Sequence, residues 1–433
     1  MARFIPAVLR ALPRDGWLLF ASRFVRLFAY GSLSVVLVFY LIGVGLSEPQ
    51  IGSLLTLTLA GDTIVSLYLT TRADRIGRRR ALLIGAALMM AAGVVFASTH
   101  QLWLLVLAGT IGVISPSGNE VGPFLPVEQA ALAQVAGDKT RTEVLAWYTL
   151  AGAFATALGA LAAGLIANGV TTMSVPTARY RAVVLFYAAM GAALSVLFVS
   201  LSVAAEAAAG ERRSAPATSP LTGLTGLDRS RAVVAKLAAL FALDAFAGGF
   251  VIQSFAAYWF YLRFNVTPAT LGSIFFWANV FAGLSALLAS RLASRFGLIK
   301  TMVGTHIPSN VLLILVPLMP TLQLAVLVLL ARFSISQMDV PTRQSYLMAV
   351  VSPEERSAAA GIAGVARTIG AAISPLFVGF MFARPSLVNL PFFLAGTLKI
   401  AYDLLLYRAF INLRPPEESA PRQRFKHNRG EFT

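Results

Sequence analysis

The chain has 433 residues, of which 57% are hydrophobic and only 12% are charged. Soluble domains carry about 25% charged residues, so this composition excludes an ordinary water-soluble domain. The sequence has no cysteine and a formal net charge of +16, which excludes disulfide bonds and thiolate metal sites and leaves the excess of basic residues to be explained.

Apolar segments long enough to cross a bilayer recur along the whole sequence. One crossing takes about 20 residues, and twelve such segments are present, which predicts an all-α integral membrane protein with twelve transmembrane helices. The first segment contains arginines and is too long for a cleavable signal peptide, so it is expected to remain in the membrane. In chain order the segments are Leu18–Val44, Ile51–Leu69, Ala81–Ser98, Leu102–Leu125, Val144–Ile166, Val183–Val203, Leu237–Tyr261, Leu271–Leu288, Thr301–Met319, Leu322–Val350, Ala358–Phe382 and Val388–Tyr407.

Basic residues are unevenly divided between the two sets of loops that alternate along the chain. One set, which includes both chain ends, holds Arg3, Arg10, Arg14, Arg72, Arg75, Arg78, Arg79, Arg80, Lys139, Arg141, Arg212, Arg213, Arg229, Arg231, Lys236, Arg291, Arg295, Lys300 and Arg356. The other set holds only Arg179, Arg181, Arg263 and Arg384. Cytoplasmic loops are the basic ones, so both termini are predicted to be cytoplasmic in a cell (inner) membrane. The charge then indicates contact with anionic lipid headgroups and not with nucleic acid.

The longest polar stretch between apolar segments runs from residue 206 to 236 and is rich in Ser, Thr, Pro and Gly. This composition is typical of a flexible linker, placed here in the cytoplasm. It divides residues 1–205, predicted as an N-terminal six-helix bundle, from residues 237–410, predicted as a C-terminal six-helix bundle. Residues 411–433 are predicted as a basic cytoplasmic tail.

The two predicted bundles repeat one residue pattern. At one constant shift, Pro126, Gln129, Leu132, Val135, Arg141 and Gly164 recur as Pro341, Gln344, Leu347, Val350, Arg356 and Gly379. At nearly the same shift, Gly52, Ser53, Ala73, Arg75 and Gly77 recur as Gly272, Ser273, Ala293, Arg295 and Gly297. The alternative is chance matching of small residues in an apolar background. Two shifts that differ only by a short insertion favour duplication, which predicts two pseudo-symmetric six-helix bundles.

A basic loop follows the second apolar segment and reads Thr70-Thr71-Arg72-Ala73-Asp74-Arg75-Ile76-Gly77-Arg78-Arg79-Arg80. It resembles the cytoplasmic signature GxLaDRxGRRR of the major facilitator superfamily. A degenerate copy at 290–300 follows the eighth segment, where that family carries its second copy. The sequence departs from the pattern at Thr70, Arg72 and Ser294. The resemblance covers the whole chain and implies a monomeric secondary transporter that uses no cofactor and binds its cargo between two halves.

The resemblance also implies a role for the charged residues of this loop. In the family, the acid and the following arginine join an acid at the cytoplasmic end of the fourth span, and Asp74, Arg78 and Glu128 occupy these positions here. With Arg75 and Gly77 they are expected to form a cytoplasmic gate motif that favours one of two conformations. The alternative is that the arginines only anchor the loop to lipid headgroups.

Ionisable side chains inside apolar segments are costly, and they usually face a pathway or a partner. Arg26 in the first segment and Asp244 in the seventh fall at corresponding points of the two halves. We expect them to pair across the cytoplasmic half of the cavity when the transporter opens outward and to separate when it opens inward. The alternative is that Arg26 reaches toward lipid phosphates and that Asp244 bonds locally.

Four further ionisable residues are candidates for binding a proton or the cargo. Asp62 lies in the second segment, and Glu120 lies among two prolines and two glycines that must loosen the fourth helix. Glu120 is the first candidate for a proton-carrying or substrate-binding acid, unless it only satisfies freed backbone groups. Asp339 and Arg332 occupy the corresponding region of the second half and are predicted as a further pair.

Aromatic and amide side chains indicate where a cargo could bind. Phe246, Phe250 and Gln253 follow one face of the seventh segment, and Tyr30 lies in the first. An apolar pocket with few polar groups is typical of ligand sites, which favours an amphipathic or aromatic cargo. Many of these rings are alternatively core or membrane-interface residues. The predicted cavity residues are Tyr30, Phe246, Phe250, Gln253, Asn279 and Gln337.

Three other features receive local explanations. No second His or Cys lies at ligand spacing from His306, so no metal site is predicted. Lys399 and Asp403 are one turn apart and are predicted to pair within their helix. The family's antiporter signature in the fifth span, a glycine series ending in Gly-Pro, is partly present at residues 152–164 and favours export.

The sequence lacks a phosphate-binding Walker loop and a nucleophile–base pair, so neither an ATP-driven pump nor an enzyme is predicted. The predicted function is secondary active transport of a small molecule by alternating access, as proton-coupled efflux through Glu120, Asp62 or Asp244. The alternatives are uptake by symport, facilitated diffusion, or a non-transporting polytopic sensor or membrane enzyme with the same fold.

Overall fold

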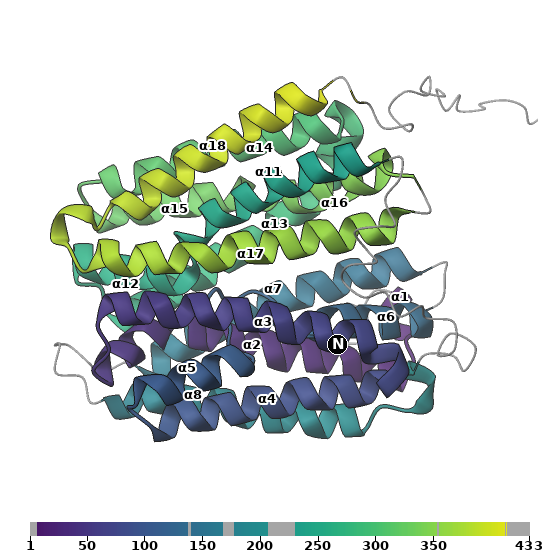
Figure 1. The fold of residues 1–433 in the computed structure, drawn as a ribbon, viewed down its shortest axis with the longest axis horizontal. Helices are drawn as coiled ribbons and strands as arrows, with labels where there is room; N and C mark the ends of the chain where they lie inside the picture. Colours follow the sequence, from purple (N-terminus) through teal and green to yellow (C-terminus); the bar gives the residue numbers. More distant parts are fainter. Residues whose placement is uncertain are drawn as a thin grey trace, which may run out of the picture.

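The computed structural model describes residues 7–136, 140–167, 177–206, 230–352, 355–411 and 413. All regular elements in these ranges are helices, arranged as two bundles side by side (Figure 1). The first bundle contains α1 (Ala7–Arg10), α2 (Arg14–Gly43), α3 (Glu48–Ile76), α4 (Arg78–Ser98), α5 (Leu102–Ile111), α6 (Phe124–Ala136), α7 (Arg141–Ile166), α8 (Thr177–Val199) and η2 (Val203–Ala205). The second contains α11 (Arg231–Gly249), α12 (Gln253–Phe264), α13 (Pro268–Phe296), α14 (Leu298–Leu315), η3 (Val316–Leu318), α15 (Leu322–Ser336), α16 (Asp339–Val350), α17 (Arg356–Phe382), η5 (Pro385–Leu387) and α18 (Leu390–Phe410).

Eleven helical segments of the described chain are long and apolar enough to cross a membrane, judged by length and composition. The remaining predicted crossing, the fourth, consists of α5, an irregular stretch and α6. This architecture agrees with the predicted all-α fold of two six-helix bundles. α1 and the last turn of α18 lie at the same end of the molecule (Figure 1), as an even number of crossings requires. We call it the basic end, because it also carries the arginine-rich turn at residues 78–80.

The break in the fourth crossing follows from its sequence. Proline removes a backbone donor and crowds the preceding turn, and Pro116 and Pro123 both lie between α5 and α6. Gly118 and Gly122 have φ angles of 71° and 78°, a region that residues with side chains disfavour. The stretch 112–123 is therefore irregular, as the sequence predicts. The tenth crossing is interrupted at the corresponding place, between α15 and α16.

One glycine joins the helices at each copy of the basic turn. Gly77 lies between α3 and α4 and has a φ of 101°, and Gly297 lies between α13 and α14 and has a φ of 89°. Glycine adopts such angles without the strain that a side chain adds. The recurrence of Gly77 as Gly297 is therefore a requirement of the turn itself.

The boundary between the bundles differs from the prediction. α11 begins at Arg231, so the seventh crossing starts more than one turn before position 237. Polar residues mark the end of the apolar segment but not the end of the helix, which can extend beyond the hydrocarbon core. Residues 207–229 of the predicted linker lie outside the described residues, and so does nearly all of the predicted tail 411–433.

The two bundles meet through two helix pairs that the duplication relates to each other. α3 packs along α17, and α7 packs along α13. An ideal Cβ on Gly52 would lie 2.4 Å from the Pro375 carbonyl oxygen and 3.0 Å from the Gly379 Cα. In the second pair, an ideal Cβ on Gly272 would lie 2.9 Å from the Gly164 Cα. Only glycine allows the backbones to approach so closely, so the four glycines found by the repeat search form the two glycine crossings between the bundles.

Hydrogen bonds also join the bundles near the end that carries the glycine crossings. We call this end, which is opposite the basic end, the sealed end. α12 and the irregular stretch supply one of them through their backbones, and side chains supply the others. The pairs are Ser254 N–H to the Pro116 carbonyl at 3.2 Å, Gln253 to Ser34 at 2.8 Å, and Tyr258 to Glu48 at 3.1 Å. These bonds and the glycine crossings hold the bundles together on the side opposite the basic end.

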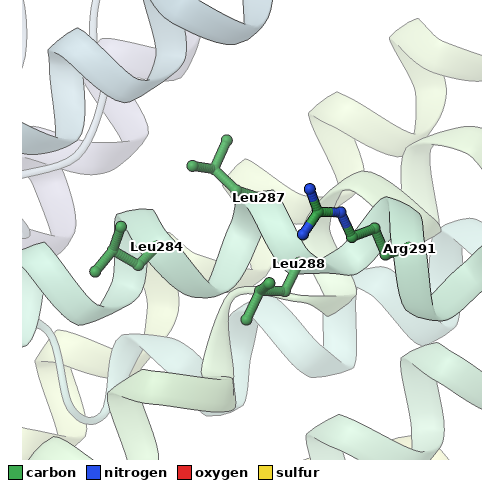
Figure 2. Close-up of a pocket in the computed structure, with 4 residues that line it drawn as sticks. All are labelled: Leu284, Leu287, Leu288 and Arg291. Atoms are coloured by element: carbon green, nitrogen blue, oxygen red, sulfur yellow. The ribbon is translucent and has the colours of Figure 1, made fainter.

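The bundles diverge toward the basic end. Ideal Cβ atoms on Gly361 and Gly364, in the part of α17 nearest that end, would meet no atom within 4 Å. A cavity of about 570 Å³ lies along the part of α13 nearest that end (Figure 2), where it is lined by Leu284, Leu287, Leu288 and Arg291. The molecule is therefore closed at the sealed end and open at the basic end.

Gly52→Ala is expected to weaken the sealed end, because the added methyl group meets backbone atoms of α17. Overpacking of this kind costs roughly 1–3 kcal/mol. The chain has no native cysteine, so opening can be followed by maleimide labelling of Ser34→Cys, a position with no exposed surface here. Labelling should become faster in Gly52→Ala but not in the control Gly304→Ala, where the added Cβ meets open space. Equal rates in the two variants would contradict the crossing.

Candidate functional site

A first cluster of charges joins α2 to the fourth crossing. Both terminal nitrogens of Arg26 donate to Glu128, at 2.6 and 2.7 Å, and its Nε donates to Glu120 at 3.1 Å. Arg23, one turn earlier in α2, donates to Glu120 at 2.6 Å. Tyr148 of α7 donates its hydroxyl hydrogen to Glu128. The cluster therefore ties α2, α6, α7 and the irregular stretch together.

The members of this cluster differ in burial. Arg26 and Glu128 have no exposed side-chain surface, whereas 17% of the Glu120 side chain is exposed. A buried ion pair is tolerated when its hydrogen-bonding groups are satisfied, and the parallel two-bond contact between Arg26 and Glu128 meets this condition. Two guanidinium groups face two carboxylates, so the cluster is neutral. Glu120 is its accessible member.

Asp62 of α3 is buried in the same bundle without such a partner. Its Oδ1 accepts hydrogen bonds from the backbone N–H of Gly122 at 2.7 Å and from the Ser66 hydroxyl at 3.3 Å. Among the acids singled out from the sequence, Asp62 alone forms no ion pair with a described cation. An ionised carboxylate buried without a cation is costly, and a bound proton removes that cost.

A second cluster of charges joins four helices of the second bundle. Asp244 of α11 accepts hydrogen bonds from Lys399 of α18 at 2.5 Å and from Arg343 of α16 at 2.8 Å. The same nitrogen of Arg343 lies 3.2 Å from a carboxylate oxygen of Asp339. All four side chains are buried. His306 of α14 completes the cluster, with its Nε2 3.9 Å from Asp244.

The predicted pair of Lys399 and Asp403 within α18 is wrong. Lys399 donates to Asp244 on another helix, and Asp403 is bound by His306 at 2.8 Å and by Asn310 at 3.3 Å. Both residues lie on the face of α18 that is turned into the bundle, where partners from α11 and α14 compete with the neighbouring turn. His306 is thus a hydrogen-bonded residue of the cluster.

Arg332 of α15 and Arg367 of α17 flank the second cluster without joining it. The Nε atoms of both are buried and have no hydrogen-bond partner. Neither side chain forms an ion pair or a hydrogen bond with a described residue. Arg332 lies within electrostatic reach of Asp339, and Arg367 within reach of Asp339, Asp244 and Arg343. The two guanidinium groups therefore leave donors free beside a set of buried charges.

The structure bears on two of the pairings expected from the sequence. Arg26 and Asp244 are not in contact in this arrangement, which is open at the basic end, and each is neutralised by groups of its own bundle. The expected pairing belongs to the conformation that is closed at the basic end, so it stays a prediction. Arg332 and Asp339 do not pair either, because Arg343, one turn along α16 from Asp339, takes that carboxylate.

The basic turn contains one of the contacts expected of the gate motif. Arg78 donates to Asp74 at 2.8 Å and to Gln134 of α6 at 2.7 Å. Glu206 accepts the backbone N–H groups of Arg78 and Arg79, where the start of α4 favours a negative charge. Gly77 makes the turn, and Arg75 is exposed in the last turn of α3.

Glu128 does not take part in the gate motif, and that expectation is wrong. Its carboxylate is fully buried and is held by Arg26, Ser22 and Tyr148. Gln134, nearly two turns further along α6, is the residue that reaches the basic turn. A position in the family pattern identified the helix correctly but could not identify which of its faces meets the turn.

The predicted cavity residues are divided between the core and the sealed end. Tyr30 is fully buried and donates to the Val121 carbonyl at 3.2 Å, so a cargo cannot reach it in this conformation. Gln253 bridges Ser34 and Asn279 at the sealed end. The others make local contacts: Phe246 packs against Phe250 and Phe377, and the Gln337 backbone donates to Ser285.

Three arginines in or beside the two clusters are not among the site residues predicted from the sequence. Arg23 lies three residues before Arg26, a spacing that places both side chains on one face of a helix and so indicates that they share partners. Arg343 lies in the interrupted tenth crossing, and Arg367 is an arginine in the middle of an apolar segment. No group of three or more His, Asp or Glu side chains in the described ranges is placed to hold a metal ion.

Comparisons with known proteins place these features in a family. An uncharacterized membrane protein of Saccharomyces cerevisiae, YJR124C, is 31% identical over 438 residues, which cover 95% of this chain and 98% of the yeast protein. The crystal structure of the nucleoside transporter NupG matches with a TM-score of 0.69 at 14% identity. The match covers 92% of this chain and 99% of the NupG chain. The crystal structure of the D-xylose-proton symporter matches with a TM-score of 0.69 at 16% identity. The match covers 91% of this chain and 97% of the symporter chain.

The two crystal structures share the fold of this chain. The family model of the Major Facilitator Superfamily matches residues 19–263 and again residues 238–432, so the match extends through both bundles and both charge clusters. The chain belongs to the Major Facilitator Superfamily, whose members are membrane transporters.

Proposed function

We propose that the chain is a proton-coupled secondary transporter that exports a small amphipathic or aromatic molecule by alternating access. The observation that carries the proposal is the pair of bundles that touch at the sealed end and separate at the basic end, each with a buried charge cluster at its centre. A monomer in the cell membrane with both termini in the cytoplasm fits the distribution of basic residues. The described conformation is then open to the cytoplasm.

The proton site in this proposal is Asp62. The carboxylates of Glu120 and Asp244 are held by arginine and lysine side chains, so protonation of either would leave buried cations without their counter-charges. Asp62 instead has only neutral donors, Gly122 and Ser66. It can gain and lose a proton without breaking an ion pair.

The proposed direction of transport rests on the glycine pattern of α7. The glycines of α7 that resemble an antiporter signature also allow close packing, since an ideal Cβ on Gly159 would lie 2.0 Å from the Phe28 carbonyl oxygen. We retain export in exchange for protons as the proposal. Proteoliposome flux under an imposed pH gradient tests it, with cargo chosen by thermal-shift screening of amphipathic compounds, because a ligand stabilises the folded chain by mass action.

The outcomes of this flux experiment separate the candidate functions. Movement of a screened compound against its gradient, in exchange for protons, supports the proposal. Movement together with protons would make the chain a symporter, and equilibration that ignores the pH gradient would make it a facilitated-diffusion carrier. A sensor or membrane enzyme that uses this fold would bind a compound without moving it.

Asp62→Asn is expected to abolish proton coupling, because an amide keeps the size of the side chain but does not titrate between neutral and anionic forms. In proteoliposomes on a solid support, a rapid pH step should produce a transient current in the parent chain that is at least about tenfold smaller in Asp62→Asn, as one titrating site per chain would imply. Glu143→Gln, an exposed acid at the start of α7, is the matched control. An unchanged transient in Asp62→Asn would exclude Asp62 as the proton site.

Glu128→Gln is expected to destabilise the chain by about 3–5 kcal/mol, because it leaves one carboxylate, Glu120, against the two guanidinium groups of Arg23 and the fully buried Arg26, so that one buried positive charge is no longer compensated. Thermal unfolding in detergent, followed by tryptophan fluorescence, measures the loss. The double variant Arg26→Met with Glu128→Met removes both charges and should recover much of the stability. A single variant as stable as the parent would show that the pair is not an anchor of the first bundle.

A further inference from the structure

The second bundle holds more positive charge than negative charge at the depth of its charge cluster. Near the middle of its membrane crossings lie four cationic side chains, Arg332, Arg343, Arg367 and Lys399, and three carboxylates, Asp244, Asp339 and Asp403. Lys399 and Arg343 are bound to Asp244, and Asp403 is bound to His306. The excess therefore resides on Arg332 and Arg367, the two members without an acceptor.

Both arginines lie too deep in the membrane to belong to the basic residues of the cytoplasmic loops, which set the orientation of the chain. Arg332 is ten residues from the start of α15 and Arg367 eleven residues from the start of α17, which is about 15 Å along each helix. That is near the middle of a membrane about 30 Å thick. A guanidinium group at this depth usually faces a partner or a pathway, and in the described chain these two have no acceptor.

A third group without a partner lies beside Arg332. Ser336 follows it by one turn on the same face of α15, and its hydroxyl is buried with no hydrogen-bond partner. Arg332 and Ser336 thus offer donors side by side just before α15 ends. α13, which lines the open cavity with Leu284 and Leu287, packs directly against α15.

We propose that Arg332 and Arg367 bind an anionic group, a carboxylate or a phosphate, carried by the transported molecule, while the leucines of α13 contact its apolar part. The inference rests on the proposed transport function and names the class of its cargo. A planar guanidinium group makes two parallel hydrogen bonds to a carboxylate or phosphate. The bound anion would supply the negative charge that the second bundle lacks, and the Ser336 hydroxyl would add a further donor.

The positive potential can be measured without knowing the cargo. The chain has no native cysteine, and Gly364 lies one turn from Arg367 with open space around its Cβ. Gly364 is also about three turns from Pro375 on the α17 face that meets α3, so a cysteine there faces the opening. In Gly364→Cys we compare the modification rates by anionic sulfonatoethyl methanethiosulfonate and by cationic trimethylammonioethyl methanethiosulfonate, in nanodiscs of zwitterionic phosphatidylcholine.

The anionic reagent should be favoured over its cationic counterpart, relative to the same ratio for a free thiol in solution. Arg332→Gln and Arg367→Gln should each reduce this preference by roughly threefold to tenfold, the size expected for one charge removed at close range in a partly aqueous cavity. Arg408→Gln, an exposed arginine at the end of α18, removes the same charge at a distance and is the control. A preference that both variants leave unchanged would overturn the proposal.

Binding is tested with ligand pairs that differ in charge. Benzoate and phenyl phosphate are added to the same labelling reaction beside the neutral benzamide and phenol. At least one anion should slow modification of Gly364→Cys while its neutral counterpart does not, and Arg367→Lys should keep the preference for the anionic reagent but weaken this protection, because an ammonium group lacks the two-bond geometry. Equal effects of the charged and neutral compounds, or no effect of either, would overturn the proposal.

Anionic lipid headgroups carry the same chemistry and are distinguished by the membrane. If nanodiscs with phosphatidylglycerol abolish the preference while soluble anions never protect, the arginines bind lipid and the assignment to cargo is overturned. Neither readout requires transport. Loss of flux with intact anion protection would therefore count against the proposed transport function alone, and intact flux without anion protection would count against the anion site alone.

Discussion

The cost of holding an ionised side chain away from water constrains this molecule more than any other interaction. Each bundle offsets this cost by pairing cations and carboxylates from different segments: Arg26 with Glu120 and Glu128 in the first, and Lys399 and Arg343 with Asp244 in the second. A broken pair would leave a bare charge in a medium of low dielectric constant. The helices of each bundle are thereby held in one arrangement, and relative motion is left to the contact between bundles, which is made of close glycine backbones and hydrogen bonds.

The contact between bundles has a different chemistry because it must be reversible. Glycine backbones in direct contact and a few hydrogen bonds, one of them from the Tyr258 hydroxyl to the Glu48 carboxylate, hold the sealed end. Such contacts can separate and be hydrated without parting two opposite charges, whereas an ion pair across the sealed end would oppose separation. This division between ion pairs inside the bundles and hydrogen bonds between them suits the alternating access proposed above.

Much of this architecture is legible in the sequence, and the reasons for the remainder are physical. Apolar length predicts the crossings, and Pro116 and Pro123 predict the break in the fourth. The repeat search finds Gly52, Gly164, Gly272 and Gly379 but does not reveal that they touch, because one-dimensional similarity carries no information about which helices are neighbours. The prediction of which buried charges pair fails for the same reason. Glu128 and Lys399 bind partners on helices distant in sequence, and a pattern within one helix does not show which partners other helices supply.

The two glycine crossings have a geometric consequence. Two fixed points define a line, so a displacement of one bundle that preserves both crossings can only be a rotation about the axis through Gly52/Gly379 and Gly164/Gly272. Such a rotation has a single degree of freedom, and it widens or narrows the mouth at the basic end by an amount that grows with distance from the axis. The aperture can therefore fluctuate in width while the opposite face stays shut, which permits molecules of unequal size to enter by the same mouth without a leak across the membrane.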